Sequence, residues 1–378
     1  MPSYVIDFEA RTFRTSSEQT IILTSMHLKA PWRSFLLWFV FGCAASAFLQ
    51  WTQVQVMGGV PEGLLFAGTW QEVHPIVVEQ LPNTPVFEGD GHDGQIFYAV
   101  GLDLRGEWVP DTLLSAPYRY RRILYPALAG GFGAWEGAGL LWGMITLSTL
   151  SVGLAAGAIG AIATVRALPG WLPVITILSP ATWLSSRLLT ADNLALALGL
   201  LAVLAFSFRR DALVVIALAA AALAKEPAIA FAVGLAGFAW FTGERSRGLR
   251  IALCSGLPMA IWWGYIYLAI GNPLDSGGNV VAPLVGIARS IPVWGLQETR
   301  DWFYLVWVLT GCVLALWVLV RGHRLWAWLI GPWLAIAAVS SHLVWHLGNN
   351  AVRALGPIVV LGFVGALDSR RDRAISPA

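Results

Sequence analysis

The residues best suited to chemistry gather in one polar stretch, residues 88–126. Its acidic residues best suited to chemistry are Asp90, Asp93 and Asp103, because a carboxylate can accept a proton from a hydroxyl group as a general base. It ends in the basic cluster YRYRR, where guanidinium groups can bind phosphate and tyrosine rings can pack against a lipid or a sugar. The predicted substrate-binding residues of this cluster are Tyr118, Arg119, Arg121 and Arg122. Because the chain is 57% hydrophobic and only 12% charged, the polar stretch is predicted to be the reactive part.

The acidic turn EGDGHDGQ precedes the aromatic, amphipathic run IFYAVGLDL. Its glycines allow a tight turn and the close approach of a substrate. Asp93 and Asp90 are therefore the predicted catalytic residues, and His92 and Gln95 beside them are predicted to contact the substrate. The same carboxylates could hold a divalent cation such as Mg²⁺ or Mn²⁺, so a metal cofactor is left open. The alternative is a solvated turn with no chemical role.

A second group of polar residues lies at the ends of apolar runs, where a charge is costly unless it is paired or faces an aqueous cavity. Its cations are predicted to converge on one anionic ligand at the outer membrane surface, and its other members to contact the substrate. The group comprises Arg187, Asp192, Lys225, Glu226, His346, Asn350 and Arg353. The alternatives are snorkelling of long side chains and, for Lys225 and Glu226, a local ion pair. His342 and His346 have a spacing that can bind zinc, but no third ligand stands in register, and no metal site is predicted.

The composition around these residues predicts an all-α polytopic membrane protein. The mean hydropathy is +0.66, and a bilayer core of about 30 Å needs roughly 20 apolar residues per helix. Strands of alternating polarity, the pattern of a membrane barrel, are absent from the sequence. The run 122–135 is glycine-rich and short, which predicts a juxtamembrane helix. About ten transmembrane helices are predicted, at residues 34–51, 138–165, 171–186, 190–207, 212–224, 228–242, 251–270, 303–320, 325–341 and 354–367.

The distribution of the basic residues predicts the direction in which these spans cross the membrane. With the N-terminus in the cytoplasm, ten spans place the short basic connections on the cytoplasmic side, as the positive-inside rule requires. The chain then divides into a cytoplasmic tail (1–33), a single integral membrane domain (34–367) that begins with an uncleaved anchor, and a cytoplasmic tail (368–378). Within the membrane domain, 52–137 and 271–302 are predicted extracytoplasmic loops. The first of them carries the predicted site and juxtamembrane helices.

Three further features of the sequence limit the classes of function that the protein can have. The cysteines, Cys43, Cys254 and Cys312, lie in apolar runs, which predicts no disulfide framework. The basic residues are scattered and the net charge is only +2, so nucleic acid is not a predicted partner. No internal repeat is evident, which weakens the case for a transporter built from inverted repeats.

The order of motifs resembles a known family. The outer-loop string HDGQIFYAVGLD is followed by YRYRRILYP, TADNLALAL, ALAKEP and NNAVRALGP. This order is similar to that of bacterial polyprenyl-phosphate-sugar glycosyltransferases of the GT-C superfamily, in particular membrane proteins related to the PIG-V type of GPI mannosyltransferase. The likeness extends from the first predicted span to the last. It implies a GT-C-like fold with juxtamembrane helices in the first outer loop.

The resemblance also implies an activity: an inverting hexosyltransferase of the bacterial plasma membrane with an extracytoplasmic active site. It would transfer a sugar, with mannose as one candidate, from a polyprenyl-phosphate carrier to an acceptor hydroxyl on a glycan or lipid of the cell envelope. Asp93 matches the family's essential acid by position. The residues expected to contact the carrier phosphate are Arg119, Arg121, Arg122, Lys225 and Arg353.

Two other functions are kept as alternatives. A transporter or flippase of a lipid-linked or anionic substrate would need charged residues along a path at mid-membrane, whereas the predicted ones concentrate at the outer face. A non-catalytic scaffold protein of envelope polysaccharide synthesis would not depend on its carboxylates. A loss of activity confined to substitutions of Asp93 and Asp90 would separate the enzyme from the scaffold.

Overall fold

The computed structural model describes residues 17–274, 278–294 and 299–375. Within these ranges the chain is helical, with three short 3₁₀ helices and a few isolated β-bridges but no strand. The predicted cytoplasmic tails fall partly outside the described ranges, at 1–16 and 376–378. The described parts of both tails are helical, because α1 (Ser17–Val56) and α17 (Gly348–Ile375) extend through them.

Among the described residues, five helices are long and apolar enough to cross a membrane. Their candidate spans contain between 23 and 29 residues, and about 20 residues of α-helix cover the 30 Å of a bilayer core. The spans are Ala30–Val56 of α1, α6 (Gly137–Val165), α12 (Arg245–Ala269), α14 (Thr299–Arg321) and Gly348–Arg371 of α17. The helical membrane class predicted from the composition is therefore supported by the structure.

Other apolar helices are shorter than a full span. They are α9 (Asp192–Ser207), α10 (Asp211–Ala224), the segment Glu226–Phe241 that contains α11 (Ile229–Phe241), and α15 (Arg324–Val339). The predicted span at 171–186 is two short helices, α7 (Pro173–Ile177) and α8 (Pro180–Arg187). The break occurs because Pro180 disfavours helical geometry in the preceding residue, and Ser179 is accordingly extended. The structure thus contains five helices of spanning length among the described residues, and the count of ten spans stays a prediction.

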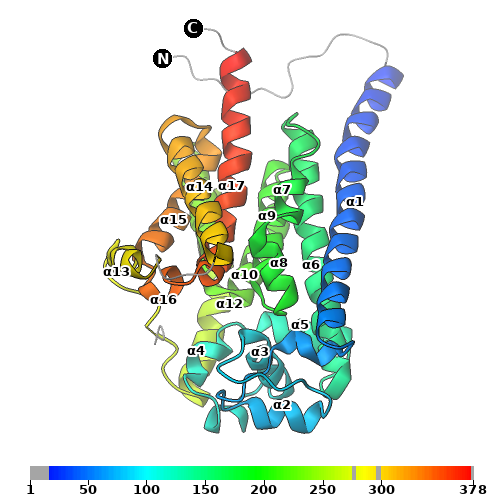
Figure 1. Ribbon diagram of the computed structural model, residues 1–378. Helices are drawn as coiled ribbons and strands as arrows, with labels where there is room; N and C mark the ends of the chain where they lie inside the picture. Colours follow the sequence, from blue (N-terminus) through cyan, green and yellow to red (C-terminus); the bar gives the residue numbers. More distant parts are fainter. Residues whose placement is uncertain (1–16, 275–277, 295–298, 376–378) are drawn as a thin grey trace.

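The region between α1 and α6 forms a cap at one end of the helix bundle (Figure 1). It contains α2 (His74–Gln80), α3 (Asp93–Leu102), α4 (Ala116–Tyr120) and α5 (Leu124–Phe132). The predicted juxtamembrane helix at 122–135 corresponds to α5, which is only nine residues long. The start of α1 and the end of α17 lie together at the opposite end of the bundle. The sides of the membrane on which the tails and the polar loop lie stay a prediction.

Small residues allow the long helices to pack closely. A Cβ atom added at Gly42 of α1 would lie 2.9 Å from the Cα atom of Gly153 in α6. One added at Gly157 would lie 2.9 Å from the carbonyl oxygen of Phe35. Close backbone approach over small residues is typical of helix pairs in membranes, where there is no hydrophobic force between helices. The glycine-rich sequence of α6 therefore fixes its position against α1.

The contact between α5 and α6 gives a prediction about stability. A Cβ atom at Gly143 of α6 would collide with the backbone carbonyl of Ala129 in α5, whereas one at Gly131 of α5 would meet no atom within 4 Å. We expect Gly143→Ala to lower the free energy of unfolding by about 1–3 kcal/mol through overpacking, and Gly131→Ala to leave it unchanged or slightly raised. Thermal unfolding of both variants in detergent tests this. Equal melting temperatures would contradict the described α5–α6 contact.

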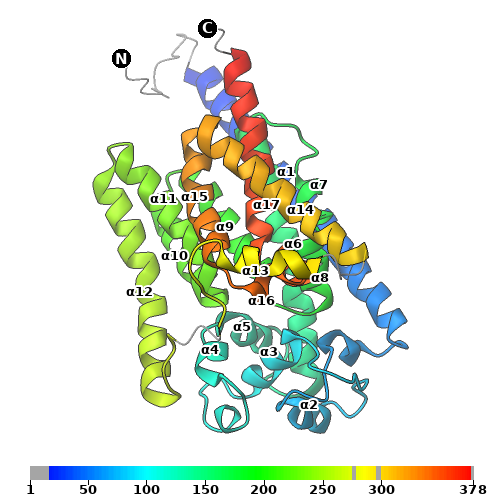
Figure 2. The same ribbon diagram turned by 60° about the vertical axis from the view of Figure 1, so that its left-hand side comes forward.

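The remaining helices close the bundle beside the cap. They are α13 (Val285–Trp294), which lies in the predicted second outer loop, and α16 (His342–Trp345), which joins α15 to α17 (Figure 2). The lower end of α12 reaches the cap, where the indole nitrogen of Trp262 donates to the backbone oxygen of Tyr120 at 2.8 Å. The hydroxyl of Tyr265 donates to the backbone oxygen of Arg105 at 2.7 Å. The cap is therefore held to the bundle by hydrogen bonds as well as by packing.

Candidate functional site

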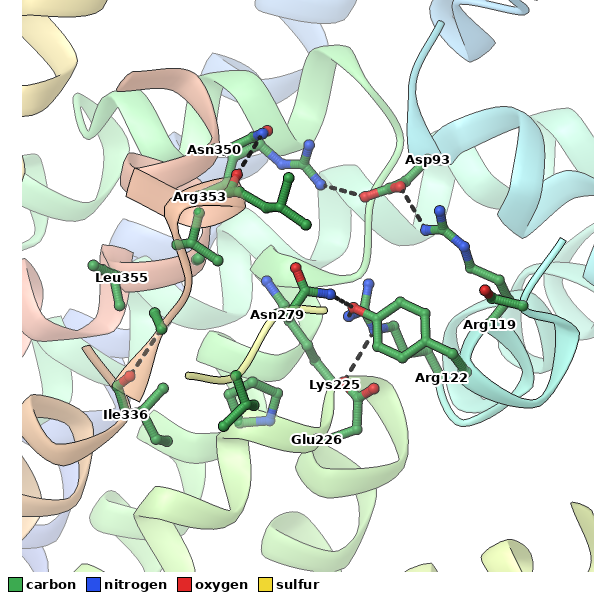
Figure 3. Close-up of a pocket in the computed structure, with 18 of the residues that line it drawn as sticks. Asp93, Arg119, Arg122, Lys225, Glu226, Asn279, Ile336, Asn350, Arg353 and Leu355 are labelled. Atoms are coloured by element: carbon green, nitrogen blue, oxygen red, sulfur yellow. Dashed lines mark hydrogen bonds and ion pairs between the residues drawn. The ribbon is translucent and has the colours of Figure 1, made fainter. Parts of the chain in front are cut away.

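A cavity of about 830 Å³ lies where the cap meets the bundle. Its polar lining comes from α3, α4, the α10–α11 junction and α17, as Figure 3 shows. Ten of the residues predicted from the sequence line it: Asp90, Asp93, Tyr118, Arg119, Arg122, Lys225, Glu226, His346, Asn350 and Arg353. Segments up to 260 residues apart in the chain meet here, as in the ion pair between Asp93 and Arg353.

Asp93 is the first residue of α3. At this position the helix dipole favours a negative charge. The next residue, Gly94, packs directly on the backbone that follows α8, since a Cβ atom there would lie 2.5 Å from the carbonyl oxygen of Leu188. Any larger residue would push the start of α3 away, so the HDG string places the carboxylate through its glycine as well as its aspartate.

Two guanidinium groups hold the Asp93 carboxylate. The Nη1 atom of Arg119 donates to Oδ1 at 3.0 Å, and the Nη2 atom of Arg353 donates to Oδ2 at 2.9 Å (Figure 3). Burial alone would raise the pKa of Asp93, but Arg353, Arg119 and Arg122 outweigh that effect and hold the pKa well below its ordinary value. Asp93 is therefore ionised at neutral pH, in a strongly positive environment.

The basic cluster around α4 divides between two carboxylates. Arg119 faces Asp93, whereas Arg121 and Arg122 form ion pairs with Glu226 at 3.2 and 3.0 Å. Their guanidinium carbons lie between 4.3 and 5.4 Å from the centre of the Tyr118 ring, within the range of cation–π attraction. The alternation of tyrosine and arginine in YRYRR thus gathers three cations around one ring.

The junction between α10 and α11 supplies the third part of the site. Lys225 is extended and ends α10, so the helix pair is interrupted where its ionisable residues face the cavity. Its ammonium forms an ion pair with Asp192 at the start of α9. Asp192 also accepts from Arg353 at 3.4 Å and from the hydroxyl of Thr190 at 2.6 Å. The alternative of a local Lys225–Glu226 pair is not what forms, because each residue pairs with a distant partner.

The ion pairs fall into two sets, one around Asp93 and Asp192 and one around Glu226, which meet at the Tyr118 ring and together form a network with an excess of positive charge. Five cations share three carboxylates, so the network carries a formal charge of +2. The cations are Arg119, Arg121, Arg122, Lys225 and Arg353, and the carboxylates are Asp93, Asp192 and Glu226. The two other acidic residues that line the cavity, Glu72 and Asp90, are exposed. An anionic group is the ligand that such a network would stabilise.

Five predicted site residues do not line the cavity, and three of them lie near it in other roles. Asp192 and Arg121 stand behind the lining as ion-pair partners. Gln95 is buried, where its amide accepts from the backbone N–H of Gly68 at 3.1 Å and donates to the backbone oxygen of Asp90 at 2.9 Å. It fixes the shape of the acidic turn, so the structure gives no support to its predicted contact with substrate.

The two others are Arg187 and His92. Arg187 ends α8, and its Nε atom is buried without a hydrogen-bond partner. It does not converge with Lys225 and Arg353 on the cavity, contrary to the expectation from their shared position at span ends. His92 precedes α3, and its ring packs edge-on against Phe66 with centroids 5.5 Å apart.

The environment of His92 predicts a pH dependence of stability. Burial, with help from Arg353, lowers its pKa from 6.5 to about 4, so the folded state favours the neutral imidazole. Its contribution to stability is complete above pH 6.5 and is lost as the pH falls towards 4. This loss amounts to about 2 kcal/mol between pH 7 and 5. We expect His92→Gln to reduce the drop in melting temperature over this interval. A variant that loses as much stability as the wild type would contradict this.

Asp103, the third aspartate of the polar stretch, has a structural role. Its carboxylate accepts backbone N–H groups of Glu107, Trp108 and Val109 at 2.8–3.0 Å, which lower its pKa against the effect of burial. The hydroxyl of Tyr120 donates to its backbone oxygen at 2.9 Å. Asp103 therefore fixes the turn that leads into α4, and it does not line the main cavity.

Within the part of the chain that the structure describes, no group of three or more His, Cys, Asp or Glu residues is placed to hold a metal ion. The rings of His342 and His346 lie 6.3 Å apart. The three network carboxylates already have cationic partners. Dependence on Mg²⁺ or Mn²⁺ therefore stays a prediction, and no step below uses a metal.

Several cavity residues were not foreseen from the sequence. Asn279, in the second outer loop, donates to the hydroxyl of Tyr118 at 3.0 Å. Met259 and Trp263 of α12 and Ile336 and Val339 of α15 form an apolar wall. The wall residues lie inside apolar runs whose periodicity gives no sign of which face meets a cavity.

No protein-family model, no curated protein and no solved structure matches this chain. The resemblance to the GT-C superfamily therefore rests on the sequence motifs alone. We infer the function from what the cavity can do chemically.

Proposed function

We propose that the protein is a membrane glycosyltransferase that takes its sugar from a polyprenyl-phosphate carrier. The observation that carries this proposal is one cavity that combines the Asp93 carboxylate, an ion-pair network of net positive charge and an apolar wall. A carboxylate suits the activation of a hydroxyl acceptor, the cations suit a leaving phosphate, and the wall suits a lipid chain. The motif resemblance points to the same reaction.

The reaction can be written with the groups on hand. An acceptor hydroxyl gives its proton to Asp93 as its oxygen attacks the anomeric carbon of the sugar. The bond from that carbon to the carrier phosphate breaks, and the phosphate leaves with the electron pair. Attack from the face opposite the phosphate inverts the anomeric configuration. The charge that grows on the phosphate oxygens is stabilised by neighbouring guanidinium groups, of which Arg119 and Arg122 line the cavity.

A lipid donor fits the position of α12. One face of this helix lines the cavity with Met259 and Trp263, while Leu253, Leu257 and Ile261 are more than half exposed. A carrier chain that lies along α12 could place its phosphate in the cavity and its hydrocarbon against apolar side chains. A sugar nucleotide lacks that hydrocarbon and is made in the cytoplasm, at the opposite membrane face in the predicted topology.

The ion-paired residues that line the cavity lie beside the cap (Figure 3). This supports the enzyme over a transporter, which needs polar groups along its path through the membrane. With the predicted orientation, the site is extracytoplasmic, in the plasma membrane of a bacterium, and serves envelope glycan or glycolipid synthesis. The acceptor is a glycan or a lipid with a free hydroxyl group.

The test is a comparison of donors. Purified protein in nanodiscs would be incubated with a membrane lipid extract and with radiolabelled sugars, supplied as polyprenyl phosphates or as sugar nucleotides. We expect label to appear in the acceptor only with the polyprenyl phosphates. Transfer from nucleotides alone would overturn the donor class. If no transfer occurs and the carrier moves between the leaflets of liposomes, the protein is a flippase and the proposed enzyme function is wrong.

A further inference from the structure

The arrangement of Asp93 raises a chemical problem. Arg119 and Arg353 each donate a hydrogen bond to the carboxylate, at 3.0 and 2.9 Å. A carboxylate held in this way has little affinity for a proton, and a general base works best when its pKa is near the working pH. The resting site therefore contains the group suited to proton transfer in a state poorly suited to it.

The binding of an anion raises a related problem, because the cations of the cavity are already paired. All four cations that line the cavity already have a carboxylate partner: Arg119 pairs with Asp93, Arg122 with Glu226, Lys225 with Asp192, and Arg353 with both aspartates. A phosphate group gains its strongest hydrogen bonds here by displacing one of these carboxylates.

The side chains of the ion pairs differ in their exposure to solvent. This difference identifies the pair that an incoming anion can break. The side chains of Asp93 and Arg119 are each 27% exposed. In comparison, Glu226 is 13% and Asp192 only 9% exposed. An ion pair that reaches solvent is weaker and breaks at lower cost than a buried one. Each of the three carboxylates has two cationic partners. Exposure is therefore what distinguishes them, and Asp93 is the carboxylate that can be exchanged.

Arg119 also has an unused donor. Its Nε atom is buried and has no hydrogen-bond partner, while its Nη1 atom is bound to Asp93. The guanidinium group can offer two parallel N–H donors to a phosphate in a bidentate contact. Release of Nη1 from Asp93 would leave the guanidinium group free to turn its Nε edge towards a phosphate dianion, which would satisfy this donor.

We propose that an anionic phosphate group binds between Arg119 and Arg353 by displacing Asp93 from both, so that one event seats the anion and frees the carboxylate to act as a base. Asp93 is then a competitor of the ligand as well as a catalytic residue. The identification of the ligand as a lipid-linked phosphate rests on the proposed function, whereas the competition itself does not. For the enzyme it imposes an order: the base becomes active only after the donor is bound.

The test measures binding of inorganic phosphate to the full chain in nanodiscs by isothermal titration calorimetry. Asp93→Asn removes the competitor with little change in shape, and we expect it to bind phosphate about 10-fold or more tightly than the wild type. Glu72→Gln is the matched control, because it removes one negative charge from the same cavity and Glu72 forms no ion pair with any described residue. We expect it to change the affinity by less than about threefold.

Each outcome decides the matter. Tighter binding by Asp93→Asn, abolished when Arg119→Gln is added, supports the exchange. Affinity in Asp93→Asn equal to that of Glu72→Gln, or below that of the wild type, overturns it. If Asp93→Asn fails to fold, the carboxylate NMR spectrum of the wild type replaces it. The signal of ¹³C-labelled aspartate carboxylates must then move on phosphate addition, and an unchanged spectrum overturns the proposal. None of these readouts requires sugar transfer, so a failed transferase assay leaves the exchange standing, and the reverse also holds.

Discussion

Replacement of Asp93 by asparagine is expected to lower the rate of sugar transfer by about 100- to 10,000-fold, the range that a positioned general base contributes. Asparagine keeps the shape of the side chain but has one acceptor oxygen, so it can accept from Arg119 or from Arg353 and not from both. A melting curve therefore separates a loss of proton transfer from a loss of folding. The measurement is the single-turnover rate of label transfer with saturating donor, alongside a melting curve.

The matched control is Asp90→Asn. Asp90 lines the same cavity three residues earlier but is exposed, and it is expected to keep most of the activity. A normal rate in Asp93→Asn with a large loss in Asp90→Asn would move the base to Asp90. Normal rates in both variants would remove the carboxylates from the mechanism.

Arg353 is expected to give the largest combined effect on stability and binding. It joins Asp93 of the cap to Asp192 of the bundle, and its side chain is only 10% exposed. Arg353→Ala leaves two carboxylates without this partner, and the loss of one member of a buried ion pair costs about 3–5 kcal/mol. We expect a clearly lower melting temperature and at least a 10-fold weaker affinity for phosphate.

Two further variants show whether this effect comes from the bridge. Arg353→Lys keeps the charge but has a single ammonium group that cannot reproduce the planar fork, so we expect it to recover part of the stability and less of the binding. Arg105→Ala removes an exposed arginine whose pair with Glu107 lies at the surface, and we expect no measurable change. Equal effects of Arg353→Ala and Arg105→Ala would contradict the network.

The sequence was most informative where polar residues interrupt apolar runs. Lys225 stands out in ALAKEP because an ionisable residue inside such a run requires a partner or a cavity, and the structure supplies both. The strings HDGQ and YRYRR were expected to act together, and Asp93 and Arg119 do meet. In these cases the cost of an unpaired charge restricts the possible structures strongly.

The sequence was less informative where three-dimensional context decides. Arg187 and Arg353 both lie near the end of a predicted span, yet only Arg353 lines the cavity. The sequence does not show in which direction each helix end places its side chain. Asp103 lies in the same polar stretch as Asp93, but the turn that follows it supplies three backbone donors and gives it a structural role. The break before Pro180 is readable from the residue pair Ser179–Pro180, but the apolar residues around it suggested one continuous span.

The central claim is that the cavity transfers a sugar away from a lipid phosphate, and the stoichiometry of the reaction tests it most directly. Wild-type protein would be incubated with a polyprenyl-phosphate sugar that carries separate labels on the sugar and the phosphate. The account predicts one polyprenyl monophosphate released for each glycosidic bond formed, with inversion at the anomeric carbon. A carrier that keeps its sugar while it moves between leaflets, or transfer without release of the monophosphate, would contradict the account.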